Sequence, residues 1–125
     1  MEFNEPKSSI PEERHYRVRL EGVDDADPGK ELGQGVAATR TGEGAYLLTW
    51  SKNPGTFVGW GAPGFGAATP ADLKGYTAVR DEYSASGSVW TLAFVVYDST
   101  FTAADLIVNQ WIDLDIVFAA TTAID

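Results

Sequence analysis

Apolar and polar side chains alternate along several short segments of this chain, a pattern typical of β-strands with one buried face. In residues 15–23, apolar side chains occupy every second position, and mainly charged side chains occupy the positions between them. The same rhythm recurs in residues 45–50 and 111–120. The predicted core-facing positions of these three segments are Tyr16, Val18, Leu20, Tyr46, Leu48, Trp50, Ile112, Leu114, Ile116 and Phe118.

Weaker strand patterns cover residues 35–41, 56–60 and 76–83. Residues 45–50 and 56–60 flank a Ser-Lys-Asn-Pro-Gly turn, so we expect them to form a hairpin. Residues 89–97 form an almost continuous apolar run, which predicts a central strand covered on both faces.

The segments between these strands carry turn residues. Residues 59–66 contain too many glycines for a regular strand, and residues 24–30 form a polar turn. Thr69 and Pro70 are typical of the start of a helical turn, and residues 102–105 predict a short capped turn.

Six to eight short strands with turn signals about 8–12 residues apart predict an all-β antiparallel β-sandwich or barrel. We assign residues 15–125 to this single β-sandwich domain. Residues 1–14 are polar and broken by two prolines, so we expect an extended N-terminal arm.

The charge balance narrows the range of partners. The 125 residues include 9 Lys and Arg against 18 Asp and Glu, a formal net charge of -9. Such a surface repels phosphate backbones, so we expect no nucleic-acid partner. No apolar run is long enough to span a bilayer, and the first residues do not resemble a signal peptide, which predicts synthesis in a cytoplasm. Cysteine is absent, which excludes disulfides and thiolate chemistry.

The residues that could support catalysis are not accompanied by the other groups that a catalytic site requires. His15 is the only histidine, and no Gly-x-Ser-x-Gly nucleophile motif is present. Asp113 and Asp115 share one face of the last strand, roughly 6.5–7 Å apart, a spacing that glycosidases also use. Simple alternation on an exposed sheet face explains the same pair. We therefore expect that the chain is not an enzyme.

Acidic residues gather in one turn, which includes Asp24, Asp25, Asp27 and Glu31. Hard cations such as calcium bind several oxygens, but this spacing does not fit an EF-hand loop. We interpret the cluster as a solvated turn and expect no metal and no cofactor.

Two aromatic residues, Trp60 and Phe65, lie in the glycine-rich segment. Three interpretations stay open. The rings could anchor a protein interface, stack on sugar rings, or fold back to cap one end of the sandwich.

Three stretches of sequence carry a resemblance to a known class of protein. They are Arg17-Val18-Arg19-Leu20, the run Ala38-Thr39-Arg40-Thr41-Gly42-Glu43-Gly44-Ala45-Tyr46-Leu47-Leu48-Thr49, and Val95-Val96-Tyr97 followed by Thr102-Ala103-Ala104-Asp105-Leu106. With a final β-strand, this order resembles capsid decoration (cement) proteins of tailed bacteriophages, or their fibre and spike relatives, across about residues 15–120.

The resemblance implies a structural virion protein that binds the capsid exterior and stabilises it. The implied partners are the major capsid protein and other copies of the chain in a homotrimer, with no membrane or nucleic acid. The expected location is the outside of the virion, after synthesis in the host cytoplasm. Our hypothetical capsid- or subunit-interface residues are Phe3, Ile10, Arg14, Trp60 and Phe65. The alternative function is a carbohydrate- or receptor-binding module of a phage fibre or tail.

Overall fold

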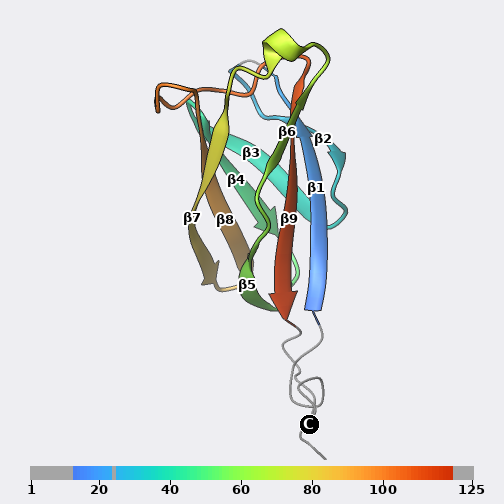
Figure 1. The fold of residues 1–125 in the computed structure, drawn as a ribbon. Helices are drawn as coiled ribbons and strands as arrows, with labels where there is room; N and C mark the ends of the chain where they lie inside the picture. The colour runs from blue at the N-terminus through green and yellow to red at the C-terminus, as the bar shows by residue number, and fades with distance from the viewer. Residues whose placement is uncertain (1–12, 24, 120–125) are drawn as a thin grey trace, which may run out of the picture.

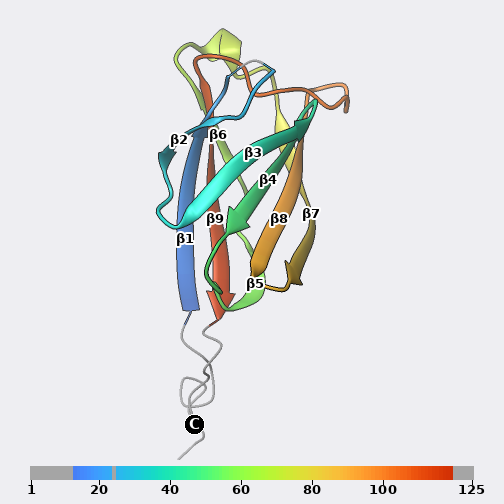
Figure 2. The ribbon, with the colours of Figure 1, turned by 180° about the vertical axis from the view of Figure 1, so that it is seen from behind.

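A computed structural model of the chain describes residues 13–23 and 25–119. Two antiparallel sheets pack face to face as a β-sandwich (Figures 1 and 2), which confirms the predicted fold class. The strands are β1 (Glu13–Glu21), β2 (Gly29–Leu32), β3 (Val36–Gly42), β4 (Ala45–Trp50), β5 (Thr56–Trp60), β6 (Gly64–Ala67), β7 (Thr77–Ser86), β8 (Val89–Tyr97) and β9 (Gln110–Ala119).

The first sheet has the order β2-β1-β9-β5, and β6 also pairs with β9. Strand β9 therefore has β1 along one edge and shares its other edge between β5 and β6. The second sheet has the order β3-β4-β8-β7. Strands β2 and β3, which follow each other in the chain, belong to different sheets and contact each other.

The core lies between the two sheets, where the alternating apolar positions meet. All of the predicted core-facing residues are buried except Tyr16, which is partly buried and packs against the core. Phe118 is the centre of an aromatic cluster, because the rings of Tyr16, Trp50, Phe57 and Tyr83 all lie within 5.2–5.7 Å of its ring centroid. The two-residue alternation in the sequence thus correctly indicates which side chains face the core between the two sheets.

The predicted hairpin of residues 45–50 and 56–60 is wrong. Strand β4 pairs with β3 and β8 in one sheet, whereas β5 pairs with β9 in the other. The Pro-Gly turn between them carries the chain across the sandwich. At Gly55 the φ angle is +117°, and an added Cβ would lie 2.2 Å from the carbonyl oxygen of Ala119. Only glycine allows this close passage beside β9.

Two short strands were missed. Strand β2 lies partly within the expected polar turn and pairs with β1 through a register shift. Strand β6 lies in the glycine-rich segment, where Gly64 and Gly66 leave room beside β9 and only four residues pair. Strands β2 and β6 form because they pair with the longer strands β1 and β9, and the local sequence pattern does not reveal such pairing.

The remaining expectations concern shorter elements. The helical turn at Pro70 is confirmed as a 3-10 turn, η2 (Pro70–Asp72). The expected turn at residues 102–105 forms instead a bridge from Ala103 to Tyr97. Within the described residues, no helix is long and apolar enough to cross a membrane.

Strand β8 is central in its sheet, as predicted, but only one of its faces packs against the other sheet. Leu92, Phe94 and Val96 are buried, and the residues between them are partly exposed. The expectation that β8 is covered on both faces is therefore wrong for the chain on its own.

Candidate functional site

The outer face of the first sheet carries a ladder of charged side chains. Strands β1 and β9 pair so that Arg17 lies opposite Asp115 and Arg19 opposite Asp113. Arg19 donates two hydrogen bonds to the Asp113 carboxylate, of 2.7 Å from Nε and 3.2 Å from Nη2. Both side chains of this pair are nearly half exposed, so the pair contributes little to stability.

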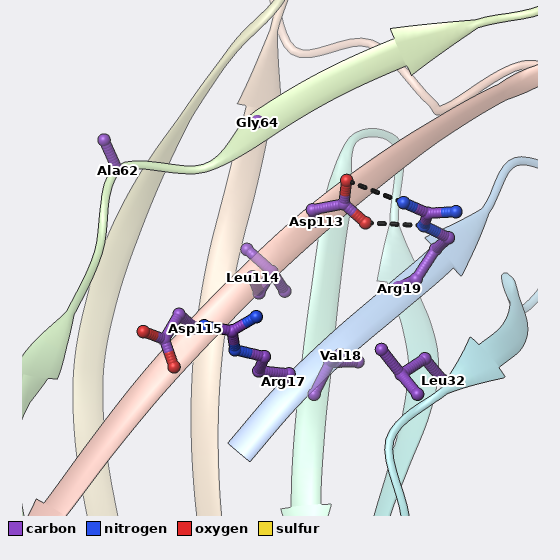
Figure 3. Close-up of a pocket in the computed structure, with 9 residues that line it drawn as sticks. All are labelled: Arg17, Val18, Arg19, Leu32, Ala62, Gly64, Asp113, Leu114 and Asp115. Carbon is purple, nitrogen blue, oxygen red and sulfur yellow. Dashed lines mark hydrogen bonds and ion pairs between the residues drawn. The ribbon is translucent and has the colours of Figure 1, made fainter. Parts of the chain in front are cut away.

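A shallow hollow of about 380 Å³ opens on this face (Figure 3). It lies where β5 ends and β6 begins, because Ala62 and Gly64 line it with almost no side-chain bulk. Leu32 of β2 closes the opposite side and is 55% exposed. Arg17 also lines the hollow, and its guanidinium makes no hydrogen bond or ion pair with any residue in the described part of the chain. The hollow therefore offers one uncommitted cationic donor.

His15 lies beside this hollow, at the exposed end of the ladder. Its Nδ1 lies 3.1 and 3.2 Å from the two carboxylate oxygens of Asp115, and its Nε2 lies 3.6 Å from Glu13. No hydroxyl group among the described residues bonds to the ring. The pair thus lacks the nucleophile that a Ser-His-Asp arrangement requires.

Of the five predicted interface residues, the structure describes Arg14, Trp60 and Phe65. Phe3 and Ile10 lie outside the described residues. Arg14 is exposed near the start of β1, in register with Phe118. Trp60 is partly buried with its ring 5.8 Å from that of Phe94, and Phe65 is partly buried against Tyr76 at 6.4 Å. Of the three interpretations of these two rings, packing against the core describes most of their surface.

The outer face of the second sheet differs sharply from that of the first. Strands β4 and β8 contain no charged residue, and the register brings their outward side chains together with those of β3 and β7. The outward positions shared by these four strands are Ala37, Thr39, Ala45, Leu47, Thr49, Thr77, Val79, Thr91, Ala93 and Val95. We call this surface the neutral face. None of these ten positions carries a charge, in a chain whose net charge is -9, although Asp81 of β7 borders them beside Val79 and Val95.

One charged side chain of β3 turns away from the neutral face. Arg40 lies opposite Tyr46 in register and donates hydrogen bonds of 3.0 and 3.1 Å to Asp105. Asp105 also accepts a 2.7 Å bond from the Gly44 N–H. Burial alone would raise the pKa of Asp105, but the bonds from Arg40 and Gly44 outweigh it and lower that pKa. The cluster ties the β8–β9 connection to the β3–β4 turn.

Tyr46 completes the same anchor from inside the core. Its hydroxyl accepts a 2.8 Å hydrogen bond from the N–H of buried Leu106. Burial raises the pKa of Tyr46 to about 12, despite the favourable effect of that bond on the ionised form. The sequence predicted Tyr46 as a core residue, but nothing in its strand pattern indicated the hydroxyl's partner sixty residues away.

The acidic turn also engages Arg40. Asp27 accepts a 2.7 Å hydrogen bond from the Arg40 backbone N–H, and Asp25 lies 3.0 Å from the guanidinium. Asp24 lies outside the described residues. In the part of the chain that the structure describes, no group of acidic or histidine side chains is arranged to hold a metal ion.

Comparison with known proteins finds no match: no family model, no curated protein and no solved structure matches this chain. Function must therefore be inferred from the two outer faces themselves.

Proposed function

We propose that this chain is a non-catalytic structural protein that docks on the outer surface of a phage capsid and stabilises it, with the neutral face as its principal contact surface. The observation that carries the proposal is the absence of charge on the outward positions of β4 and β8, in a chain with twice as many acidic as basic residues.

The distribution of charge favours a protein partner. The centres of protein interfaces are depleted in charged residues, because each charge would lose its hydration on docking. The remaining acidic surface keeps the free protein soluble and repels nucleic acid. The neutral face also extends over four neighbouring strands, which suits contact with a broad protein surface.

Docking of this kind stabilises a shell by mass action, because a protein that binds only the assembled state favours that state. No reacting group is required. The predicted interface residues Phe3 and Ile10, together with exposed Arg14 at the start of β1, would add contacts beyond the neutral face. Their role stays a prediction.

The first test is whether the chain is present on purified virions of its source, in fixed ratio to the major capsid protein, by quantitative mass spectrometry. Its absence from virions would refute the proposal. Virions stripped of the chain are then incubated with recombinant protein, and bound protein is measured after sedimentation.

Matched variants test the face itself. Thr49→Asp places a negative charge on the neutral face, whereas Thr56→Asp places the same charge at the exposed start of β5 in the other sheet. We expect Thr49→Asp to weaken capsid binding at least ~10-fold, because an unpaired charge would be desolvated. Thr56→Asp should bind like the wild type. Equal binding by both variants would remove the neutral face from the contact.

Residues 1–12 are tested separately. Deletion of residues 1–12, which lie within the predicted arm of residues 1–14, should reduce capsid binding while leaving the melting temperature of the sandwich unchanged. Full capsid occupancy by the truncated protein would exclude Phe3 and Ile10 as capsid anchors.

A second candidate function has one observation in its favour. The hollow of the first sheet offers the uncommitted guanidinium of Arg17 beside the Arg19–Asp113 pair, and planar polar groups of this kind bind sugar hydroxyls and carboxylates. A glycan array with the wild type, Arg17→Ala and the exposed control Lys52→Ala tests it. Loss of signal in Arg17→Ala alone would support a carbohydrate-binding module, and an array without signal would dismiss it.

A further inference from the structure

A single aromatic side chain stands out from the sandwich next to the neutral face. Phe101 lies in the β8–β9 connection, which projects from one end of the molecule in both ribbon views (Figures 1 and 2). Its side chain is 75% exposed, the highest value among the large exposed hydrophobic residues of the described chain. Its φ angle is +65°, a conformation that costs a non-glycine residue about 1–2 kcal/mol.

The loop around Phe101 is held in place by one carboxylate. Oδ1 of Asp98 accepts hydrogen bonds of 2.8 Å from the Thr100 N–H, 2.7 Å from the Thr100 hydroxyl and 3.1 Å from the Thr102 N–H. These bonds lower the pKa of Asp98. The backbone adds bonds from Asp98 to Thr102 and from Phe101 to Asp98. The exposed ring is therefore presented on an ordered loop, which reduces the entropy lost when it binds.

A hollow that could receive such a ring lies beside it. A depression of about 260 Å³ between β7 and β8 is lined by Val79, Arg80, Asp81, Val95 and Tyr97. The Arg80 guanidinium itself lies 4.9 Å from the centroid of the Phe57 ring. A cavity of about 150 Å³ is enough to hold a benzene molecule. The Tyr97 ring borders the hollow and also lies 5.6 Å from the Phe101 ring. The projecting ring and the hollow are thus neighbours on one side of the molecule.

We propose that two copies of this chain pair about a two-fold axis next to Tyr97, each inserting Phe101 into the Val79–Val95–Tyr97 hollow of the other. When a ring and a hollow lie side by side, a two-fold axis between them lets the ring of each copy enter the hollow of the other. A cyclic trimer would instead require Phe101 and the hollow to lie on different sides of the molecule.

The charge distribution favours a second copy as the occupant. Two molecules of net charge -9 repel each other over most of their surfaces. They can approach most closely along β8, because β8 itself has no charged residue.

This pairing goes beyond the proposed function and shares with it only the neutral face. It uses the end of that face near Phe101, and it leaves the opposite end of β4, including Thr49, for the capsid. The tests separate the two: pairing is measured on the purified chain alone, and docking on particles.

The experiment is sedimentation equilibrium of the full chain from about 1 to 200 µM, the range in which weak dimers dissociate. We expect a species of twice 13.5 kDa for the wild type. Phe101→Asn removes the ring and keeps a residue that tolerates positive φ, and Val79→Asp places a charge in the hollow. Each should raise the dissociation constant by on the order of 100-fold, because the two-fold axis uses every contact twice. The control Val58→Asn, at an exposed position of β5 in the other sheet, should dimerise normally.

A mixture of the two variants gives the sharpest result. In a mixed pair, Phe101 of the Val79→Asp chain meets an intact hollow on the Phe101→Asn chain, so one of the two contacts is restored. The mixture should therefore form dimers at lower concentration than either variant alone. Circular dichroism and thermal melting establish that each variant is folded. A wild type that stays monomeric or forms trimers, unchanged pairing in Phe101→Asn, or no gain in the mixture would each overturn the pairing.

Discussion

Replacing Tyr46 by phenylalanine removes only the buried hydroxyl, which bonds to the Leu106 N–H and interacts with the Asp105 carboxylate, and it leaves the aromatic ring in place. The Tyr46 side chain is 1% exposed, and its partner Leu106 is fully buried. In the variant, the Leu106 N–H loses its 2.8 Å acceptor. A buried donor without a partner costs about 1–3 kcal/mol, so the free energy of unfolding at pH 7 should fall by that amount.

The same substitution should change the response to alkaline pH. The pKa of Tyr46 is about 12 in the folded chain, against an ordinary value of 10.0. The folded state thus keeps a proton that the unfolded state releases. The stability that the folded state gains from protonated Tyr46 is fully present below pH 10 and is lost as the pH rises to about 12. This loss amounts to about 2–3 kcal/mol in the wild type.

The assay is urea unfolding of both proteins at several pH values between 7 and 12, followed by tryptophan fluorescence. Other tyrosines titrate in both proteins, so the difference between the two curves isolates Tyr46. We expect the variant to be less stable at pH 7 and the gap to close, or to reverse, near pH 12. A gap that is constant across this range would refute the reasoning that burial of the hydroxyl sets its pKa.

Three further substitutions test other features. Gln110→Leu should lower the free energy of unfolding by about 1–3 kcal/mol, because buried Gln110 accepts a hydrogen bond from the Ile107 N–H; urea unfolding measures it. Gly44→Ala should lower the melting temperature more than Gly87→Ala does. Both glycines have positive φ, but only at Gly44 would a Cβ meet backbone, at 2.6 Å. Asp105→Asn should flatten the acid limb of the stability curve. The lowered pKa of Asp105 gives stability that is present above its unfolded pKa near 4 and is lost as the pH falls through the folded value, which unfolding at pH 2–7 would show.

The strands and the core were predictable because their signal is local. Strands β4, β5 and β8 have the predicted bounds, and β9 begins one residue before its predicted start. Each side chain's face follows from its parity along the strand, which requires no knowledge of the partner strand. The same locality explains the wrong hairpin of β4 and β5. A Pro-Gly turn between two strands does not reveal whether the second strand stays in the same sheet or crosses to the other.

The candidate surfaces were less predictable because they arise from pairing. Asp113 and Asp115 were recognised as neighbours on one face, but the partners that engage them, Arg19 and His15, come from register with β1. Phe101 was missed because a single aromatic in a Ser-Thr-Phe-Thr segment has no periodic neighbours. The neutral face was readable in part, since the lack of charge in residues 45–50 and 89–97 is a property of the sequence alone.

We expected β8 to be covered on both faces, and the face that is not fully covered belongs to the neutral face. A strand that is apolar on both sides normally lies in a sheet covered on both faces. In this chain the inner side of β8 is buried in the core between the two sheets, while Ala93 and Val95 on the outer side are only partly covered. Water-facing strands usually alternate with polar side chains, as β1 and β9 do on their outer faces. The composition of β8 is therefore what a strand would have if a second protein supplied the missing layer, and the neutral face is where that layer would pack.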